Sequence, residues 1–167
     1  LENLPTRAAF VAQLGRFLAV AGDDHPDPAE LERRVAVRVG QPRTLLTYLL
    51  LHPGHAAQRA TLVEELWPDV PADRGRRYLS DALYRLRRAL DPAPILADAE
   101  RIALDMQQAW WVDVWEFYAA ATSHDPHQRV ASLDLYAPTL APEISDHWIL
   151  VQRVRLQERF VQTALEV

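Results

Sequence analysis

The sequence predicts a mainly helical fold with a small β component. Apolar residues recur at helical spacing in three segments between residues 42 and 90, and in three more after residue 112. Between these two groups, short apolar runs flank a polar turn and indicate a β-hairpin. The chain has 167 residues, of which 49% are apolar and 25% charged, so it can bury one substantial core or two small ones.

Composition limits the setting in which the protein works. The longest apolar run covers residues 45–51 and is interrupted by Thr47, so it is far shorter than the roughly 20 residues that a membrane span needs. The first ten residues lack the basic start and the small-residue cleavage site of a signal peptide, and the chain has no cysteine. These features predict a cytoplasmic protein with no membrane contact.

The N-terminal part of the chain has the least regular pattern. Residues 7–24 contain apolar residues that suit a helix, but Gly15 interrupts them, and two short strands broken at this glycine are favoured. Val35, Val37 and Val39 alternate with polar or small residues, as in a half-buried strand. We therefore expect a small sheet ahead of the helices.

Two short helices are predicted next. Pro42 suits the first turn of a helix that the "HPG" stretch ends at Gly54. Four leucines are expected on its buried face: Leu45, Leu46, Leu49 and Leu50. The second helix, "QRATLVEELWP", ends at Pro68, and its inward residues are Leu62, Val63 and Leu66.

A cationic helix is predicted over residues 74–90, with Asp73 as its N-cap. At about 100° per residue, its apolar residues fall on one narrow stripe: Leu79, Ala82, Leu83, Leu86 and Leu90. The opposite face carries Arg77, Asp81, Tyr84 and Arg88, bordered by Arg74 and Arg85. Solvated faces usually mix both charges at i,i+4 spacing, which occurs here only along Arg77, Asp81 and Arg85. Nucleic-acid contact and a merely solvated surface are thus equally compatible with this helix alone.

The hairpin favours the first of these interpretations. Its strands are expected at residues 95–97 and 102–104, and Arg101 is the only cation in a turn that also carries Asp98 and Glu100. Two helices, a cationic third helix and a hairpin are the order of elements in a winged helix-turn-helix. In that fold the third helix enters the major groove of DNA and the wing touches the adjacent backbone.

Several stretches of the chain resemble one family of bacterial transcriptional activators. "LLLHPG", "ELWPD", "LRRAL", "RIALD" and "VDVWEF" are similar to the OmpR-type winged helix of the antibiotic regulatory protein family. Residues 131–166, which begin "ASLDLYA", resemble the opening of the bacterial transcriptional activator domain, an all-helical tetratricopeptide-like module. The resemblance implies a winged-helix domain over residues 1–112 and the beginning of the helical domain over residues 113–167.

The resemblance also implies a function and partners. We expect a sequence-specific DNA-binding transcriptional activator with residues 74–90 in the major groove of double-stranded DNA. The helical module is expected to contact RNA polymerase, a second copy of the chain, or further domains of a longer chain. The predicted DNA contacts are Arg74, Arg77, Ser80, Tyr84, Arg85, Arg88 and Arg101.

Three departures leave an alternative open. Asp98 and Glu100 lie where glycine and cations would suit a wing that touches phosphate. Asp81 can accept a hydrogen bond from cytosine but also repels phosphate. Residues 137–138 are Ala-Pro where the family usually has Arg-Gly. A protein-interaction or scaffolding module whose winged helix no longer binds DNA would have a similar sequence.

The sequence predicts no enzyme, metal site or cofactor. The histidine pairs in "HPGH" and "SHDPH" lie in turns without further metal ligands. Glu64 and Glu65 are adjacent on a helix and therefore point about 100° apart, which does not place two carboxylates on one substrate. Four tryptophans are expected in the core rather than on a stacking platform: Trp110, Trp111, Trp115 and Trp148.

Three helices are predicted after residue 112. Asp125 and Ser145 are the expected N-caps of the second and third, with Pro126 in a first helical turn. The last helix has a mainly apolar side marked by Trp148, Val151, Val154 and Phe160. Helical repeats bury such sides only against neighbours. We expect further helices, the winged helix or a second copy to cover this side.

Overall fold

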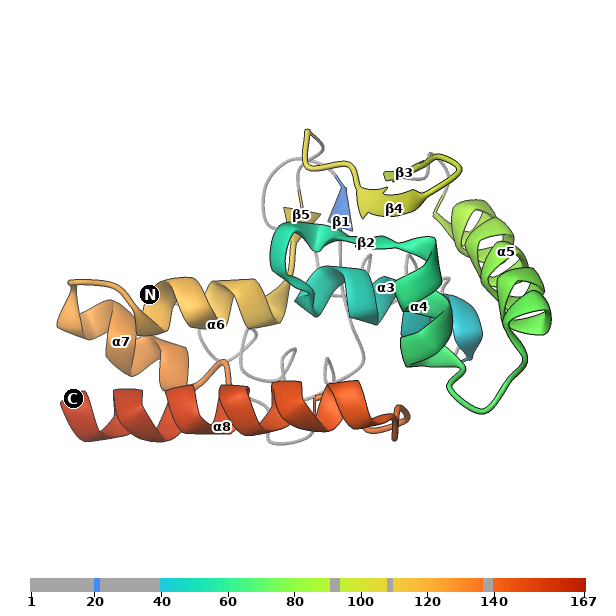
Figure 1. The fold of residues 1–167 in the computed structure, drawn as a ribbon. Helices are drawn as coiled ribbons and strands as arrows, with labels where there is room; N and C mark the ends of the chain where they lie inside the picture. The colour runs from blue at the N-terminus through green and yellow to red at the C-terminus, as the bar shows by residue number, and fades with distance from the viewer. Residues whose placement is uncertain (1–19, 22–39, 91–93, 108–109, 137–139) are drawn as a thin grey trace. The chain divides into compact units, whose positions relative to one another are not determined.

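A computed structural model describes residues 20–21, 40–90, 94–107, 110–136 and 140–167 (Figure 1). The chain divides into two compact units, Glu32–Ala109 and a second unit that contains Leu1–Leu31 and Trp110–Val167. The mainly helical fold with a small β component is confirmed. None of the described helices is both long and apolar enough to cross a membrane. Of the stretch around Gly15 where two strands were expected, only residues 20–21 are described, and they form a strand. The strand expected at residues 35–39 lies outside the described residues.

The first unit begins its described part with helix α3 (Gln41–Leu51). Pro42 lies in its first turn, as predicted, and the four leucines expected on its inner face are all buried. The helix ends at a short 3₁₀ turn, Pro53–His55, in which Gly54 has φ +74. That left-handed conformation is one that glycine adopts without the steric cost of a Cβ, which explains why the "HPG" stretch ends the helix.

Helix α4 (Arg59–Leu66) follows a three-residue strand, β2 (Ala56–Gln58), that the sequence pattern did not predict. The inward residues of α4 are those expected, since Leu62, Val63 and Leu66 are buried. Trp67 caps its C-terminus, and Pro68 prevents its continuation.

Helix α5 (Ala72–Ala89) packs on both α3 and α4. Leu79, Leu83 and Leu86 are buried, as are Leu45 and Leu49 of α3, so the buried faces predicted for the two helices are confirmed. The prediction of Asp73 as N-cap is wrong. Pro71 is the N-cap, and Asp73 lies within the first turn. The positive end of the helix dipole stabilises its carboxylate there, which also forms an ion pair with Arg76.

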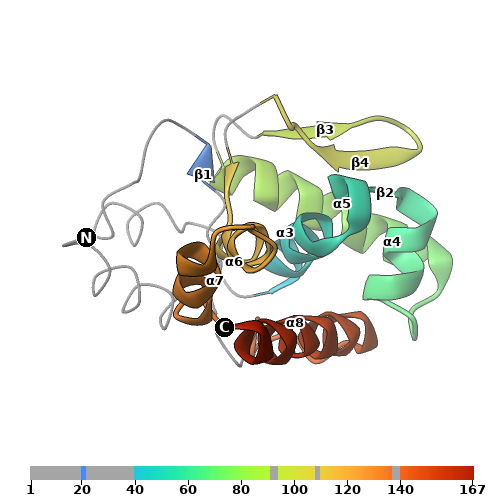
Figure 2. The same cartoon turned by 90° about the vertical axis from the view of Figure 1, so that its left-hand side faces the viewer.

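The predicted hairpin is confirmed as β3 (Ile95–Ala97) and β4 (Arg101–Leu104). Strand β4 lies in the centre of an antiparallel sheet of order β2-β4-β3, in which Ala57 and Ala97 both pair with Ile102. Ile102 is fully buried and anchors the sheet in the core. Figure 2 shows the hairpin lying along α5, with α3 and α4 forming the rest of this winged helix-turn-helix.

The second unit contains a two-stranded sheet and three helices. Strand β1 (Val20–Ala21) pairs antiparallel with β5 (Trp110–Trp111). The helices are α6 (Asp113–Ala121), α7 (Pro126–Leu133) and α8 (His147–Glu166), which pack on one another. Strand β1 thus lies in the same unit as β5 and the three helices.

Aromatic side chains connect α6 to α8 through Tyr136, which follows α7. Phe117 of α6 is buried, and its ring centroid lies 6.2 Å from that of Tyr136. Tyr136 in turn stacks on Phe160 of α8 at 4.0 Å. Trp148 is buried as predicted, while Trp110 and Trp115 are half-buried.

One of the two predicted N-caps in this unit is confirmed. The Asp125 side chain accepts a hydrogen bond from the backbone N–H of His127, next to Pro126 in the first turn of α7. The prediction of Ser145 is wrong by one residue, because Asp146 is the N-cap of α8. Its carboxylate makes no capping hydrogen bond, so the position follows from the backbone rather than from a side-chain cap.

The predicted apolar side of α8 is only partly correct. Val151 and Val154 are exposed, and Ile149 and Leu156 are buried instead, beside the half-buried Phe160. The Arg153 guanidinium donates to the carbonyl oxygens of residues 140, 141 and 144 at 2.6–2.8 Å and thereby fixes the rotation of the helix. The opposite side of α8 carries exposed apolar residues: Leu150, Val151, Val154, Val161 and Leu165.

Candidate nucleic-acid interface

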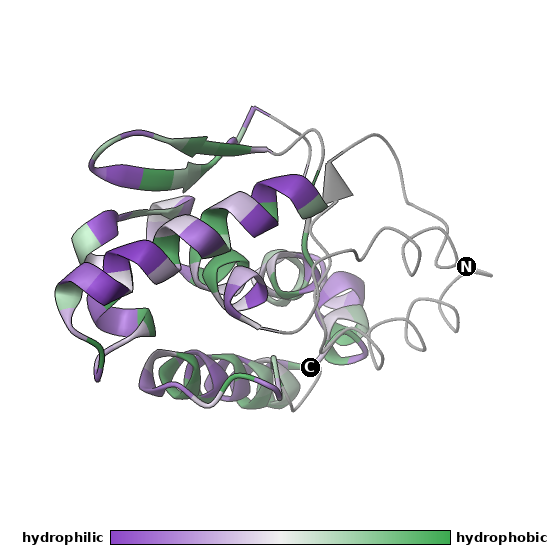
Figure 3. Cartoon of the chain, turned by 90° about the vertical axis from the view of Figure 1, so that its right-hand side faces the viewer, coloured by the Kyte–Doolittle hydropathy of each residue, from purple (hydrophilic) through white to green (hydrophobic). Residues whose placement is uncertain are grey.

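The outward face of α5 presents the side chains that the sequence predicted. The buried residues of this helix are Gly75, Leu79, Ala82, Leu83 and Leu86, so their stripe leaves the opposite side in solvent. Figure 3 shows hydrophilic positions dominating that side. All six predicted contact residues of the helix are exposed: Arg74, Arg77, Ser80, Tyr84, Arg85 and Arg88.

The arginines of this face differ in whether their guanidinium groups have partners within the domain. Arg85 forms an ion pair with Asp81 one turn earlier, at 3.0 Å between Nε and Oδ2. The Arg88 guanidinium lies 5.8 Å from the Tyr84 ring centroid, and its Nη1 donates to the Tyr84 hydroxyl at 3.5 Å. Within the described part of the chain, Arg74 and Arg77 have no hydrogen-bond or ion-pair partner. Their guanidinium donors are therefore available to an external acceptor.

Tyr84 and Ser80 add uncharged groups to the same face. Tyr84 is 60% exposed, which places an aromatic ring in solvent beside the guanidinium of Arg88. The Ser80 hydroxyl donates to the carbonyl oxygen of Arg76 at 2.9 Å. Its proton is thus engaged within the helix, and its lone pairs remain to accept a hydrogen bond, for example from a base amino group.

The wing turn is closed by its own aspartate. The Asp98 carboxylate accepts hydrogen bonds from the backbone N–H groups of Glu100 and Arg101, at 2.8 and 2.7 Å. These two bonds, aided by the charges of Arg101 and Arg59, hold the pKa of Asp98 below its usual value. The carboxylate therefore stays ionised, and Arg101 projects as an exposed cation from an otherwise acidic turn.

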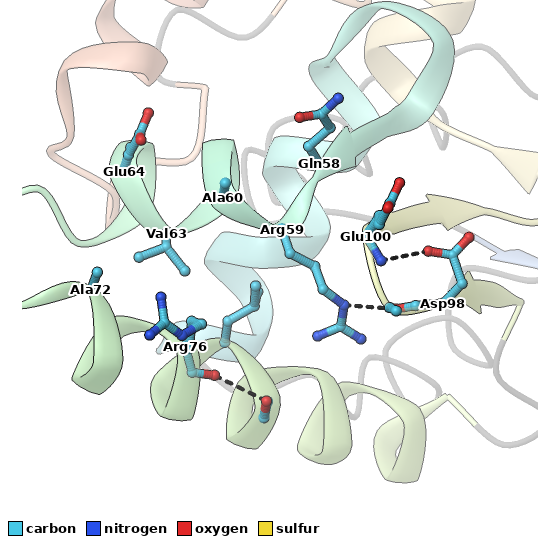
Figure 4. Close-up of a pocket in the computed structure, with 12 residues that line it drawn as sticks. Gln58, Arg59, Ala60, Val63, Glu64, Ala72, Arg76, Asp98 and Glu100 are labelled. Atoms are coloured by element: carbon cyan, nitrogen blue, oxygen red, sulfur yellow. Dashed lines mark hydrogen bonds between the residues drawn. The ribbon is translucent and has the colours of Figure 1, made fainter.

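Arg59 belongs to this site, although the sequence pattern did not single it out. It is the first residue of α4 and lines a cavity of about 840 Å³ between α4, α5 and the wing turn (Figure 4). Its Nε donates to the carbonyl oxygen of Asp98 at 2.8 Å. An arginine at the start of a predicted helix carries no local signal of such a role, because the partner lies far along the chain.

Part of the first unit is similar to a known protein family. Residues 40–102 match the family model described as "Transcriptional regulatory protein, C terminal", the OmpR/PhoB type of winged helix. The match supports a winged-helix domain of the kind found in DNA-binding transcriptional regulators. No curated protein matches the chain. The matched family is one of DNA-binding domains of transcriptional regulators, and the match does not favour the scaffolding alternative.

Each of the histidines and glutamates considered as possible catalytic or metal-binding groups in the winged-helix domain either contacts α3 or lies in solvent. His52 stacks on Tyr48, with ring centroids 5.1 Å apart, and His55 Nδ1 lies 3.3 Å from the carbonyl oxygen of Leu49. Glu64 and Glu65 are both exposed on α4. Among the residues that the structure describes, no group of three or more His, Cys, Asp or Glu side chains is placed to hold a metal ion.

Proposed function

We propose that the chain is a sequence-specific transcriptional regulator that inserts α5 into the major groove of DNA. The observation that carries this proposal is the pair Arg74 and Arg77, near the start of the third helix of the winged helix-turn-helix. Both are exposed and have no partner among the residues that the structure describes. Recognition helices contact base edges chiefly through their N-terminal residues, which is where these two arginines lie.

The remaining residues of the site divide by position along the helix. Ser80 and Tyr84 lie on the same exposed face and are assigned, with the two arginines, to base edges. Arg85 and Arg88 lie nearer the C-terminus of α5, and Arg101 lies on the wing, so these three are assigned to phosphates. Asp81 neutralises part of the charge of Arg85, which makes Arg88 the stronger phosphate contact of the helix.

A gel-shift experiment tests this function. Genomic fragments upstream of the protein's own operon are titrated with the full chain at two salt concentrations. Each phosphate contact releases counterions, so the affinity should fall steeply, with a slope near −0.9 per contact in log K against log salt. A shallow salt dependence, or no shift of any fragment, would instead favour a winged helix that docks on a protein.

The similarity to antibiotic regulatory proteins supports a more specific role. On that similarity, we propose an activator in which residues 1–112 bind DNA and residues 113–167 begin a tetratricopeptide-like activator domain. This helical part would contact RNA polymerase or a second copy of the chain, and the protein would act in the cytoplasm. In vitro transcription tests the role: adding the protein should raise transcript yield from the bound promoter, and a lowered yield would identify a repressor.

A further inference from the structure

Arg59 joins the start of α4 to two points of the wing turn. Its backbone N–H donates to the carbonyl oxygen of Glu100 at 2.7 Å, and its Nε donates to the carbonyl oxygen of Asp98 at 2.8 Å. The first N–H groups of a helix have no acceptor within the helix. Here the wing turn supplies that acceptor, and the same residue adds a second bond through its side chain.

The wing turn that Arg59 holds is itself closed by hydrogen bonds. Besides the two bonds to the Asp98 carboxylate, the Asp98 N–H donates to the carbonyl oxygen of Arg101 at 3.0 Å. The neighbouring sheet pairs Gln58 with Arg101. A turn with these internal bonds moves as one piece, so its position depends on the sheet and on Arg59.

Arg59 also lies between the wing and α5. In Figure 4 its side chain extends from α4 between the wing turn on one side and the α5 residues that line the cavity on the other. Arg76 and Ser80 belong to the α5 wall of that cavity. The guanidinium therefore occupies the space that separates the two DNA-facing parts of the domain.

We propose that Arg59 is a positioning residue for DNA recognition, a role that rests on the proposed function. It holds the wing turn where Arg101 can reach the DNA backbone while α5 occupies the groove. The contact of α5 with the groove and the contact of Arg101 with the DNA backbone must form at the same time. A wing turn held only by the sheet would less often lie where Arg101 reaches that backbone. Arg59 thus acts through Arg101 rather than by touching DNA itself.

A double-mutant cycle in the full chain tests this role. Binding to one specific DNA site is measured for R59A, R59K, R101A and the two double variants. Lysine keeps the charge but has no N–H at the place of Nε, so R59K and R59A should both weaken binding by about 3- to 10-fold, as loss of one hydrogen bond does. Neither should weaken it further when residue 101 is already alanine. As a control, R59A and R77A should combine independently, because Arg77 lies on the outward face of α5.

Other results would overturn the role. Full rescue by R59K, or a further loss in the R101A background with a salt slope shallower by about 0.9, would show that Arg59 itself contacts a phosphate. Unchanged binding in R59A would show no role. Failure of the wild-type chain to bind DNA would overturn the proposed function and with it the role of Arg59. Normal binding by the wild type and unchanged binding by R59A would overturn the role of Arg59 alone. Thermal unfolding checks each variant, and R59K, which keeps the aliphatic stem and charge, serves if R59A does not fold.

Discussion

Asp113, the first residue of α6, is a buried carboxylate, and no charged group of the described residues pairs with it. It is only 8% exposed, and burial raises its pKa to about 6, although its side chain accepts a hydrogen bond from the backbone N–H of Val114. A folded-state pKa above the unfolded value means that the folded protein binds the proton more tightly. The contribution of Asp113 to stability is therefore most favourable below the unfolded pKa of 3.8, declines as pH rises toward 6, and is constant above that.

Replacing Asp113 by asparagine should remove this dependence. We expect D113N to be more stable than the wild type by about 1–3 kcal/mol at pH 7, with the difference shrinking toward pH 4. Urea unfolding of both proteins across this range measures it. Taking the difference between the two curves cancels the titration of the other carboxylates. A difference that stays constant with pH would show that Asp113 titrates normally.

The arginines of α5 should separate by their effect on sequence preference. R77A should lose about 1–3 kcal/mol of affinity for a specific site and little for random DNA, since Arg77 lies near the N-terminus of the helix with its donors unpaired. R88A should weaken both alike, since Arg88 lies in the last turn, where we assign it to phosphate. Competition titrations with random DNA check this, and an R77A variant indifferent to DNA sequence would remove Arg77 from the base contacts.

At the scale of elements, the approach of α5 to α4 depends on Gly75. A Cβ at this position would lie 2.5 Å from Cγ1 of the buried Val63, closer than side chains approach in folded proteins. Glycine costs a helix interior up to about 1 kcal/mol relative to alanine, so its presence here indicates that close helix packing outweighs helix propensity. The packing sets the direction in which α5 leaves the α4–α5 turn.

The sign of the Gly75→Ala effect should depend on Val63. In the wild type, G75A should destabilise the domain by about 1–2 kcal/mol, the cost of overpacking less the gain in propensity. In a V63A background, where the clashing methyl groups are absent, the same change should stabilise by up to about 1 kcal/mol. Thermal unfolding of the four proteins measures the cycle. The same sign in both backgrounds would refute the steric explanation.

Elements whose stability is encoded within their own residues were predictable. The leucine stripes of α3 and α5 and the apolar runs of the β3–β4 hairpin each identify an element locally, and all are confirmed. Strand β2 was missed because Ala56–Gln58 has little strand propensity and forms only by pairing with β4. Helix α8 has apolar residues on two sides, so the local pattern could not decide which is buried. The contacts of Arg153 with the preceding loop decide it.

In the candidate DNA interface, too, the residues set by local sequence were predictable and those set by distant contacts were not. The exposed face of α5 follows from helical periodicity, so Arg74 and Arg77 could be selected from the sequence. Arg59 could not, because its two acceptors are carbonyl oxygens of the wing turn, and backbone carbonyls leave no trace in the sequence. Asp98 was predicted only as an unfavourable charge, whereas it closes the wing turn.

At the scale of the whole molecule, the cationic face belongs to an acidic protein. The formal net charge is −5, although α5 alone carries six arginines and only two aspartates. DNA binding therefore depends on a local field, and the acidic remainder opposes it wherever its charges lie within a Debye length, about 10 Å at 0.1 M salt. Glu64 and Glu65 are exposed on α4 of the same unit, outside the proposed contacts, and allow a test of this opposition.

Neutralising those two carboxylates should strengthen DNA binding in a salt-dependent way. We expect E64Q/E65Q to bind both specific and random DNA about 2- to 5-fold more tightly at low salt, because the domain then carries two fewer charges that repel phosphate. The advantage should vanish near 0.5 M salt, where the Debye length falls to about 4 Å. The charge-conserving variant E64D/E65D is the matched control and should bind like the wild type at every salt concentration. An E64Q/E65Q advantage that persists at high salt, or that appears on the specific site alone, would mean that these residues act by contact rather than through the field of the molecule.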